Sequence, residues 1–345
     1  MNSRTNRRPT IVDVAASAGV SKSLVSLVLR GASTVSEERR RLVLAAAAEL
    51  GYRPNGVARS LVQRRSNLFG ILLSDLHNPF FADVIDGVQT AAFENGYNTI
   101  ISVVDHRILA ERRALDTLLD LRIDGLILAN PTPEINAVTM ASKEVPVVVI
   151  ARRKRRMNSV DSVNNDDPTG AALAVQHLAD LGHQRIAHID GGGSAAAAAR
   201  KLGYERAMQL RGLEAHIHIT PGGCIDDGGR HGVAALFASD SHPTAIFVAN
   251  DLAALGALSA LSERGLRVPG DVSVVGYDDT ALAAVRQINL TTVDQPRADM
   301  GRTAVTLLME RLNGNRDTAR HVLMPPTLVV RGTTAARRNA PDSRP

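Results

Sequence analysis

The side chains best suited to hold a small polar molecule follow predicted strands in the second half of the chain. Asn250 and Asp278 each end a short apolar run, and Gln295 lies where the chain is predicted to cross back between two lobes. Ligands of open α/β sheets bind in the crevice beyond the strand ends, where amide and carboxyl groups can exchange hydrogen bonds with ligand hydroxyls. All three are candidate ligand contacts, although each could instead be a hinge or salt-bridge residue.

Two adjacent aromatic residues, Phe80 and Phe81, follow the first predicted strand in a chain that is only 3% aromatic. An aromatic face packs well against the apolar face of a sugar or a base ring, so both are candidate ligand contacts. Both could equally be core residues, and this alternative weighs more heavily for Phe80 than for Phe81.

The sequence lacks the common catalytic motifs. It contains no HExxH, no GxSxG and no GxxxxGK[ST] segment. The run Gly191-Gly192-Gly193-Ser194-Ala195-Ala196 loosely fits a dinucleotide-binding loop, but no acidic ribose-binding partner is placed for it, and we expect a flexible loop near the ligand cleft. The ten histidines are scattered and Cys224 is the single cysteine. We therefore predict no catalytic residue, metal site or cofactor.

Positive charge is concentrated at the N-terminal end of the chain. Residues 1–65 carry 12 Lys and Arg against 4 Asp and Glu, a net charge of +8, whereas the whole chain has a net charge of +5. Such a local excess suggests a polyanionic partner such as nucleic acid. A solubilising tail is the alternative, but a tail would lack the helical apolar pattern of this segment.

The first 50 residues are predicted to form three short helices. Apolar side chains recur with the spacing of one helix face, at Ile11, Val14, Ala15 and Ala18, at Leu24, Val25, Val28 and Leu29, and at Leu42, Val43, Ala46 and Leu50. Gly19 suits a tight turn, and Ser21 and Ser36 can cap the second and third helices. This pattern is typical of a helix-turn-helix module, whose second helix enters a DNA major groove.

Several short motifs occur together in the same segment. They are Thr10-Ile11-Val12-Asp13-Val14-Ala15, Ala18-Gly19-Val20-Ser21, Val25-Ser26, Val35-Ser36, Leu50-Gly51-Tyr52, Pro54-Asn55 and Val57-Ala58-Arg59-Ser60-Leu61. Through them the segment resembles the DNA-binding headpiece of the lactose-repressor family of transcription regulators. The resemblance implies a set of DNA contacts at Thr10, Ser21, Lys22, Ser23, Ser26, Leu27, Arg30, Asn55, Ala58 and Leu61.

One of these implied contacts departs from the family pattern. Lys22 and Ser23 match positions that usually read base edges, but Leu27 stands where the family commonly carries Arg. A leucine cannot donate hydrogen bonds to guanine. It could touch a thymine methyl or pack inward as a core residue, and we expect the operator to differ at the base pair that faces it.

A short hinge helix is predicted after Pro54, which cannot continue the preceding helix, with Asn55 as its cap. It spans only about two turns, so it is marginal alone in water. The resemblance implies that two such helices pair in a dimer on the minor groove, where Leu61 would wedge between base steps and kink the duplex. The alternative is a linker helix with Leu61 packed on the core.

From residue 66 onward, apolar strand-like runs alternate with amphipathic helical segments. The predicted strands are 68–73, 99–104, 125–129, 146–150, 185–189, 244–248, 272–276 and 326–331, and the predicted helices are 82–95, 109–121, 167–181, 200–210, 228–238, 251–264 and 297–312. Buried strands separated by helices indicate parallel sheets. Their two series indicate two doubly wound lobes.

Motifs in this core resemble the two-lobed fold shared with periplasmic binding proteins. They are Asn78-Pro79-Phe80-Phe81, Leu181-Gly182-His183, Val248-Ala249-Asn250-Asp251, Val274-Val275-Gly276-Tyr277-Asp278-Asp279 and Leu290-Thr291-Thr292-Val293-Asp294-Gln295-Pro296. The resemblance implies effector contacts at Arg152, Arg200, Asn250, Asp278 and Gln295, to which we add Asn78, Phe80 and Phe81. Ala151 replaces an acidic residue found in many sugar-binding members, which weakens a simple-sugar assignment. The basic run 152–156 suggests a solvated loop or, alternatively, an anionic effector.

The predicted fold is an N-terminal all-α helix-turn-helix domain plus an α/β periplasmic-binding-protein-like core of two doubly wound parallel-sheet lobes. The predicted divisions are a headpiece at 1–53, a hinge at 54–65, a core at 66–335 and a disordered tail at 336–345. Within the core, lobe 1 covers about 66–164 and 295–322, and lobe 2 covers about 165–294 and 323–335.

The predicted function is that of a sequence-specific DNA-binding transcription regulator, and we expect it to be a repressor and not an enzyme. Its partners would be a pseudo-palindromic double-stranded operator, a second copy of the chain and a small polar effector, with a sugar or sugar derivative favoured. No signal peptide or membrane segment is expected, so the predicted location is the cytoplasm. The alternative is a soluble two-lobed solute-binding or enzymatic protein with an accessory basic arm.

Overall fold

The computed structural model describes residues 9–29, 31–52, 65–73, 75–104, 108–130, 135–151, 158–238 and 241–337. The chain forms two compact units, which divide between Ser66 and Asn67. The predicted contacts Arg30, Asn55, Ala58, Leu61 and Arg152 lie outside the described residues, as do positions 54–64 of the predicted hinge and 338–345 of the predicted tail.

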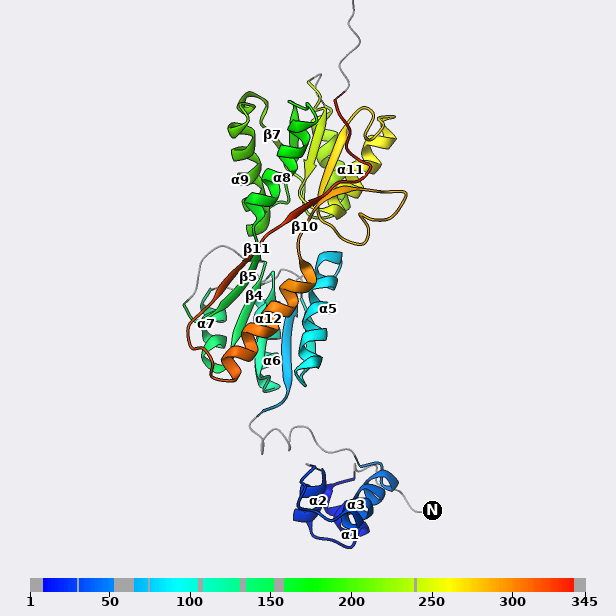
Figure 1. Cartoon of the computed structure of the whole chain (residues 1–345), viewed down its shortest axis with the longest axis vertical. Coiled ribbons are helices and arrows are strands. Elements are labelled where there is room, and N and C mark those ends of the chain that lie inside the picture. The colour runs from blue at the N-terminus through cyan, green and yellow to red at the C-terminus, as the bar shows by residue number, and fades with distance from the viewer. Residues whose placement is uncertain are drawn as a thin grey trace, which may run out of the picture. The chain divides into compact units, whose positions relative to one another are not determined.

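The N-terminal unit contains three short helices, α1 (Ile11–Ser17), α2 (Lys22–Leu29) and α3 (Glu37–Glu49) (Figure 1). Their apolar faces meet in one small core, in which Val14, Val25 and Val43 are fully buried. Among the described residues no single helix is long and apolar enough to span a membrane. Only α1 and α2 taken together pass that test of length and composition, with a bend of 106° between them.

Local hydrogen bonds fix the ends of the first two helices. A capping box starts α1, because the Thr10 hydroxyl accepts from the Asp13 amide while the Asp13 carboxylate accepts from the Thr10 amide. Gly19 has a φ of 64° in the turn that follows, a conformation that favours glycine. Ser21 then accepts from the Leu24 amide at 3.2 Å at the start of α2. The predicted helix–turn–helix is therefore formed, although the predicted cap Ser36 makes no side-chain bond to α3.

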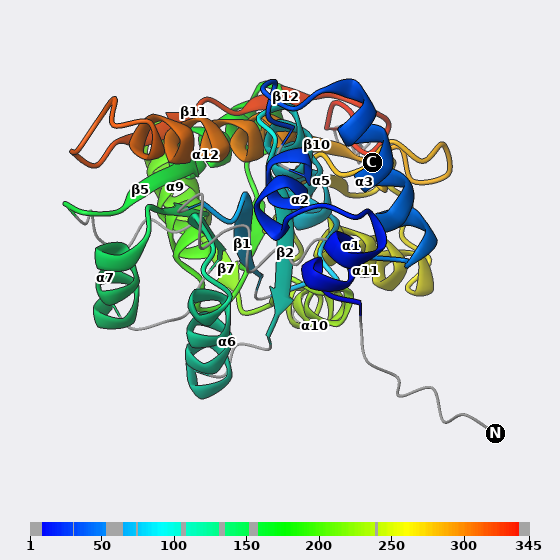
Figure 2. The same cartoon turned by 90° about the horizontal axis from the view of Figure 1, so that it is seen from below.

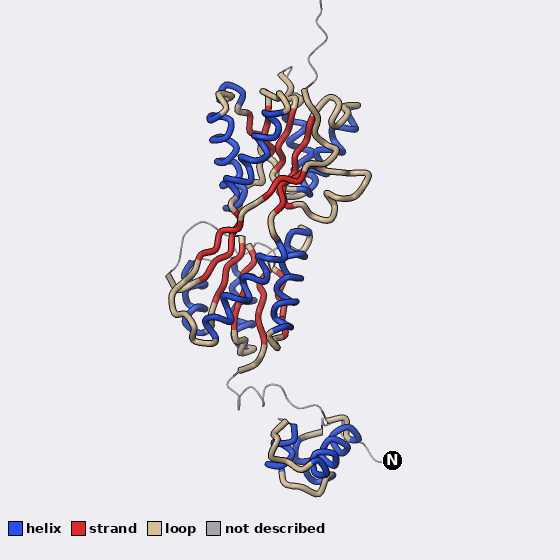
Figure 3. The backbone as a smooth tube through the Cα atoms, in the orientation of Figure 1, coloured by secondary structure: helices blue, strands red, loops and turns tan. Residues whose placement is uncertain are grey.

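Lobe 1 is a six-stranded parallel sheet in the order β11-β5-β4-β3-β1-β2. Figure 3 shows the strands of the core in red and the surrounding helices in blue. The strands are β1 (Leu68–Leu73), β2 (Asn98–Val103), β3 (Gly125–Ala129), β4 (Val147–Ile150), β5 (Asp161–Asn165) and β11 (His321–Met324). Helices α5 (Pro79–Glu94) and α12 (Arg297–Leu312) cover one face, and α6 (Ile108–Asp120) and α7 (Ile135–Glu144) cover the other (Figure 2). Because the central strands are buried on both faces, their sequences are continuous apolar runs.

Lobe 2 repeats this plan with the strand order β12-β10-β9-β8-β6-β7. Its strands are β6 (Ile186–Ile189), β7 (His218–Thr220), β8 (Ala245–Val248), β9 (Ser273–Asp278), β10 (Thr291–Asp294) and β12 (Thr327–Val329). Helices α8 (Asp167–Asp180) and α9 (Ala195–Leu210) cover one face, and α10 (Asp226–Leu236) and α11 (Asp251–Glu263) cover the other. The sheet is parallel, as predicted, except at its edge, where β12 runs antiparallel to β10.

The chain passes between the lobes three times, after β5, after β10 and after β11. The third passage follows Met324, slightly beyond the predicted boundary at 322, because residues 321–324 extend the lobe 1 sheet by pairing with β5. The predicted disordered tail also begins too early. The Arg337 amide donates to the Leu181 carbonyl at 2.8 Å, so the chain is bound to lobe 2 through residue 337.

Candidate functional site

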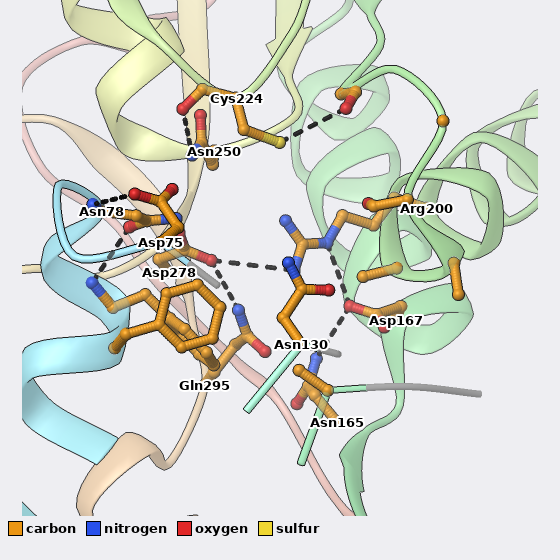
Figure 4. Close-up of a pocket in the computed structure, with 18 residues that line it drawn as sticks. Asp75, Asn78, Asn130, Asn165, Asp167, Arg200, Cys224, Asn250, Asp278 and Gln295 are labelled. Atoms are coloured by element: carbon orange, nitrogen blue, oxygen red, sulfur yellow. Dashed lines mark hydrogen bonds and ion pairs between the residues drawn. The ribbon is translucent and has the colours of Figure 1, made fainter. Parts of the chain in front are cut away.

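A cavity of about 440 Å³ lies between the two lobes, lined by the first turns of α5 and α9 and by the carboxyl ends of several strands (Figure 4). Every predicted ligand residue within the described part of the chain lines it, namely Asn78, Phe80, Phe81, Arg200, Asn250, Asp278 and Gln295. Arg152 is not described, but the preceding residue, Ala151, lies on the wall. The cavity is therefore at the strand-end crevice that the sequence predicted.

Arg200 is the buried cation of this cavity. Its Nε donates to Asp167 at 3.0 Å, its Nη1 donates to the Ala249 carbonyl at 2.6 Å, and its guanidinium carbon lies 3.8 Å from the ring centroid of Tyr277. Burial alone would lower the pKa of Arg200, but Asp167 and Asp278 together raise it above its usual value. The guanidinium is thus permanently charged and held in one orientation by the protein.

Asp278, at the end of β9, faces Arg200 without bonding to it directly. The Arg200 Nη2 lies 3.7 Å from the Asp278 carboxylate, which is longer than a hydrogen bond. Gln295 Nε2 donates to the same oxygen at 2.5 Å. Burial raises the pKa of Asp278 to about 7, and Arg200 offsets only part of that rise. Near neutral pH this carboxyl group can therefore act as an acceptor or, when protonated, as a donor.

Two of the predicted contacts, Asn78 and Asn250, are helix caps as well as cavity residues. The Asn78 side chain accepts from the Phe80 amide at 3.0 Å at the start of α5. Asn250 accepts from the Ala253 amide at 3.0 Å and donates to the Cys224 carbonyl at 3.0 Å. These bonds leave both N–H donors and one lone pair of Asn78, and one N–H donor and one lone pair of Asn250, available to a ligand.

Phe80 and Phe81 are both core residues and cavity residues, so the two alternatives are not exclusive. Their side chains are only 4% and 5% exposed, and their rings meet edge to face at 5.0 Å between centroids. Both belong to the apolar cluster between α5, α12 and the lobe 1 sheet. Because so little of each side chain is exposed, we expect both to shape the apolar wall of the cavity.

Sequence reasoning missed several cavity residues, namely Asp75, Asn130, Asn165, Asp167 and Cys224. Asn165 Nδ2 donates to the Tyr277 hydroxyl at 2.7 Å, while its Oδ1 is buried and has no hydrogen-bond partner among the described residues. Asn165 ends strand β5, so the strand-end rule would have found it had that polar strand been predicted. Burial raises the pKa of the Cys224 thiol to about 11, which favours its protonated form at neutral pH.

The glycine run 191–193 forms the loop that leads into α9. Ser194 caps this helix by accepting from the Ala197 amide at 3.1 Å, and Asp190 accepts from the Gly192 and Gly222 amides at 3.1 and 3.2 Å. The loop lines the cavity as predicted. Among the described residues no group of three His, Cys, Asp or Glu side chains is placed to hold a metal ion.

The predicted DNA-contacting surface lies at the start of α2. Ser21, Lys22 and Ser23 are exposed, whereas Ser26 and Leu27 are partly buried. Part of the Leu27 side chain packs against the core of the unit, which is one of the two alternatives considered for it. The rest remains exposed. Thr10 is engaged in the cap of α1. The other four predicted contacts lie outside the described residues.

Each of the two units matches a known protein family. Residues 10–55 match the model of the bacterial regulatory proteins of the lacI family, and residues 175–334 match a periplasmic binding protein-like domain. The ribose operon repressor of Haemophilus influenzae is 35% identical over 328 residues, which cover 93% of this chain and 97% of that protein.

Solved structures agree with this match. The lac repressor dimer bound to operator and the anti-inducer ONPF is 34% identical, with a TM-score of 0.86 over 96% of this chain and 100% of that one. A LacI family transcriptional regulator from Enterococcus faecium with bound ribose is 28% identical, with a TM-score of 0.72 over 79% of this chain and 100% of that one.

Proposed function

Since the chain belongs to the LacI family of bacterial regulatory proteins, we propose that it represses transcription by binding an operator through α1 to α3, under the control of a small hydroxylated ligand held between the lobes. Membership of this family of DNA-binding regulators excludes the alternative of a solute-binding or enzymatic protein with a basic arm. The observation that carries the proposal is one chain that joins a basic helix-turn-helix unit to a polar cavity between two lobes.

The DNA side of the proposal rests on α2. Lys22 and Ser23 are exposed at its first turn, while Val25 and Val28 on the other face hold it in the unit. The first turn of such a helix is the part that reaches base edges. A homodimer on a pseudo-palindromic operator would present two copies of α2, and cytoplasmic location follows from access to the chromosome.

The ligand side of the proposal rests on the polarity of the cavity. Arg200 Nη2 offers a donor, whereas Asn165 Oδ1 and Asp278 offer acceptors. The described walls carry the carboxyl groups of Asp75, Asp167 and Asp278 beside the guanidinium of Arg200, a set that can both accept hydrogen bonds from ligand hydroxyls and donate to them. A neutral sugar fits best, and the ribose-bound relative supports this class.

A duplex titration tests the DNA-binding role. The probe is a duplex selected by the full-length protein from a randomised pool, and the readout is fluorescence anisotropy at several salt concentrations. Lys22→Ala is expected to weaken binding by about 1–3 kcal/mol, because it removes a side chain at the base edges, and binding by the unaltered protein should fall steeply with salt as counterions are released.

The matched control is Lys143→Ala, which removes an exposed lysine from α7 in lobe 1. It should bind like the unaltered protein. If the full chain selects no duplex, or if both variants bind equally well, the proposed DNA-binding role of α2 is wrong.

A further inference from the structure

Arg297 is the first residue of α12 and directly follows the second passage between the lobes. Its side chain is 16% exposed and reaches three other segments. Nε donates to Asp83 of α5 at 2.7 Å, and Nη1 donates to Asp294 at 3.0 Å and to the backbone carbonyl of Asp278. A cation in the first turn of a helix is disfavoured by the helix dipole, so these acidic partners must stabilise it there.

In lobe 1, Arg297 joins its own helix, α12, to α5 through Asp83, and these two helices pack closely. A Cβ atom at Gly87 of α5 would collide with the Ala298 carbonyl of α12, and one at Gly301 of α12 would collide with the Val84 carbonyl of α5. The two backbones are therefore in direct contact, so we expect the two helices to move as a pair. The first turn of the same α5 carries Asn78, Phe80 and Phe81 on the cavity wall.

Arg297 has two lobe 2 partners, Asp294 at the end of β10 and Asp278, and Asp278 is the one that faces the ligand cavity. The Asp278 carboxylate points to Arg200 and Gln295, while its backbone carbonyl accepts from Arg297. Its φ is 112°, a conformation that L residues rarely adopt and that persists only where contacts enforce it. Any backbone rotation that lets Asp278 engage a ligand would also move the carbonyl that Arg297 holds.

We propose that Arg297 is an interlobe clamp, a positioning residue that fixes the ligand-facing Asp278 of lobe 2 to the α5–α12 pair of lobe 1. Through this clamp the conformation of Asp278 and the angle between the lobes are set together. The lobe angle is the two-state element that ligand and operator would both bias. Only this last step rests on the proposed function, because the clamp itself requires neither ligand nor DNA.

Hydrogen exchange of the full-length protein without ligand tests the clamp. The reporter is a peptide covering 276–283, which includes the Thr280 amide that donates to Asp251 at 2.7 Å. Arg297→Gln should raise its exchange rate by about fivefold or more, the factor expected when local stability falls by about 1 kcal/mol. Asp83→Asn, a change in lobe 1, should also raise exchange in this lobe 2 peptide, and the double variant should add little.

The control is Arg302→Gln. Arg302 lies one turn further along α12 and pairs with Glu94 of α5 at 3.7 Å, so it too joins α12 to α5 but within lobe 1. It should leave the 276–283 peptide unchanged. Equal exchange in Arg297→Gln and the unaltered protein overturns the clamp, and so does an effect of Arg297→Gln that Asp83→Asn fails to reproduce, because that pattern indicates local packing alone.

A second measurement tests the regulatory step, with D-ribose as the probe. The ratio of operator dissociation constants with and without D-ribose should shrink by about fivefold or more in Arg297→Gln and stay unchanged in Arg302→Gln. A full response to D-ribose in Arg297→Gln overturns the regulatory role. Failure of the unaltered protein to respond would contradict the proposed effector instead, and the exchange experiment would still decide the clamp.

Discussion

At the scale of single residues, Asp278 is a cavity residue whose charge changes near neutral pH. Burial raises its pKa to about 7, with Arg200 opposing and Asp251 adding to the rise. Burial likewise raises the pKa of Asp251 to about 6. Arg297 lies close on the other side and favours the ionised form. A ligand hydroxyl that donates to Asp278 would therefore bind more strongly once this carboxyl has lost its proton.

This raised pKa predicts how stability depends on pH. The folded-state pKa of Asp278, about 7, exceeds the usual value of 3.8. Between these two pH values the folded protein therefore binds a proton that the unfolded chain has lost. The resulting stabilisation is complete below about pH 4 and is lost as the pH rises through about 7. Urea denaturation of the unaltered protein and Asp278→Asn should show their difference in unfolding free energy falling over that window, by at most about 1.4 kcal/mol per pH unit. A constant difference would show that Asp278 titrates normally.

The cavity residues found from the sequence either follow a predicted strand or were implied by the family resemblance. Asn250 and Asp278 end apolar strands, and Arg200 was identified by resemblance. Asn165 and Asp167 were missed because they flank the end of β5, whose sequence Asp-Ser-Val-Asn-Asn lacks the apolar run of a buried strand. The hydrogen bond from Arg297 to Asp83 joins residues 214 positions apart, and no local pattern can reveal such a pair.

At the scale of elements, the predicted strands and helices hold wherever apolar periodicity is strong. Strand β1 has the predicted bounds, and α12 does as well. The elements that were not predicted are short or polar, so tertiary contacts rather than local sequence stabilise them, and they are β5, β7, β10, β11 and α7. Helix α5 begins three residues earlier than predicted, because Asn78 and Pro79 supply the cap and first turn.

The close contact of α5 and α12 gives a prediction about stability. Gly301→Ala should destabilise the protein by about 1–3 kcal/mol, because its Cβ would overlap the Val84 carbonyl and force the helices apart. Gly193→Ala is the control, since its Cβ would meet nothing within 4 Å, and it should change stability by less than about 0.5 kcal/mol. Equal unfolding free energies for the two variants in urea would show that the helices separate without cost.

At the scale of the whole molecule, both the helix-turn-helix unit and the two-lobed core were predictable, because motifs along nearly the whole chain resemble one family. The third passage between the lobes was placed slightly early, since the sequence of β11 does not show which sheet it joins. The position of the cavity follows from the topology, because both lobes turn strand ends and helix starts toward it. The donors and acceptors that the cavity offers a ligand depend on contacts between residues far apart in the sequence, so they could be found only from the structure.

The most direct test of ligand-controlled repression is an operator titration of the full-length protein with and without D-ribose. D-ribose should change the operator dissociation constant by about fivefold or more. Asp278→Ala should lose this response but retain ligand-free operator binding, while the control Asp116→Ala, an exposed carboxylate on α6, should respond normally. An operator affinity that neither D-ribose nor any other neutral sugar alters, or a full response in Asp278→Ala, would contradict ligand-controlled repression.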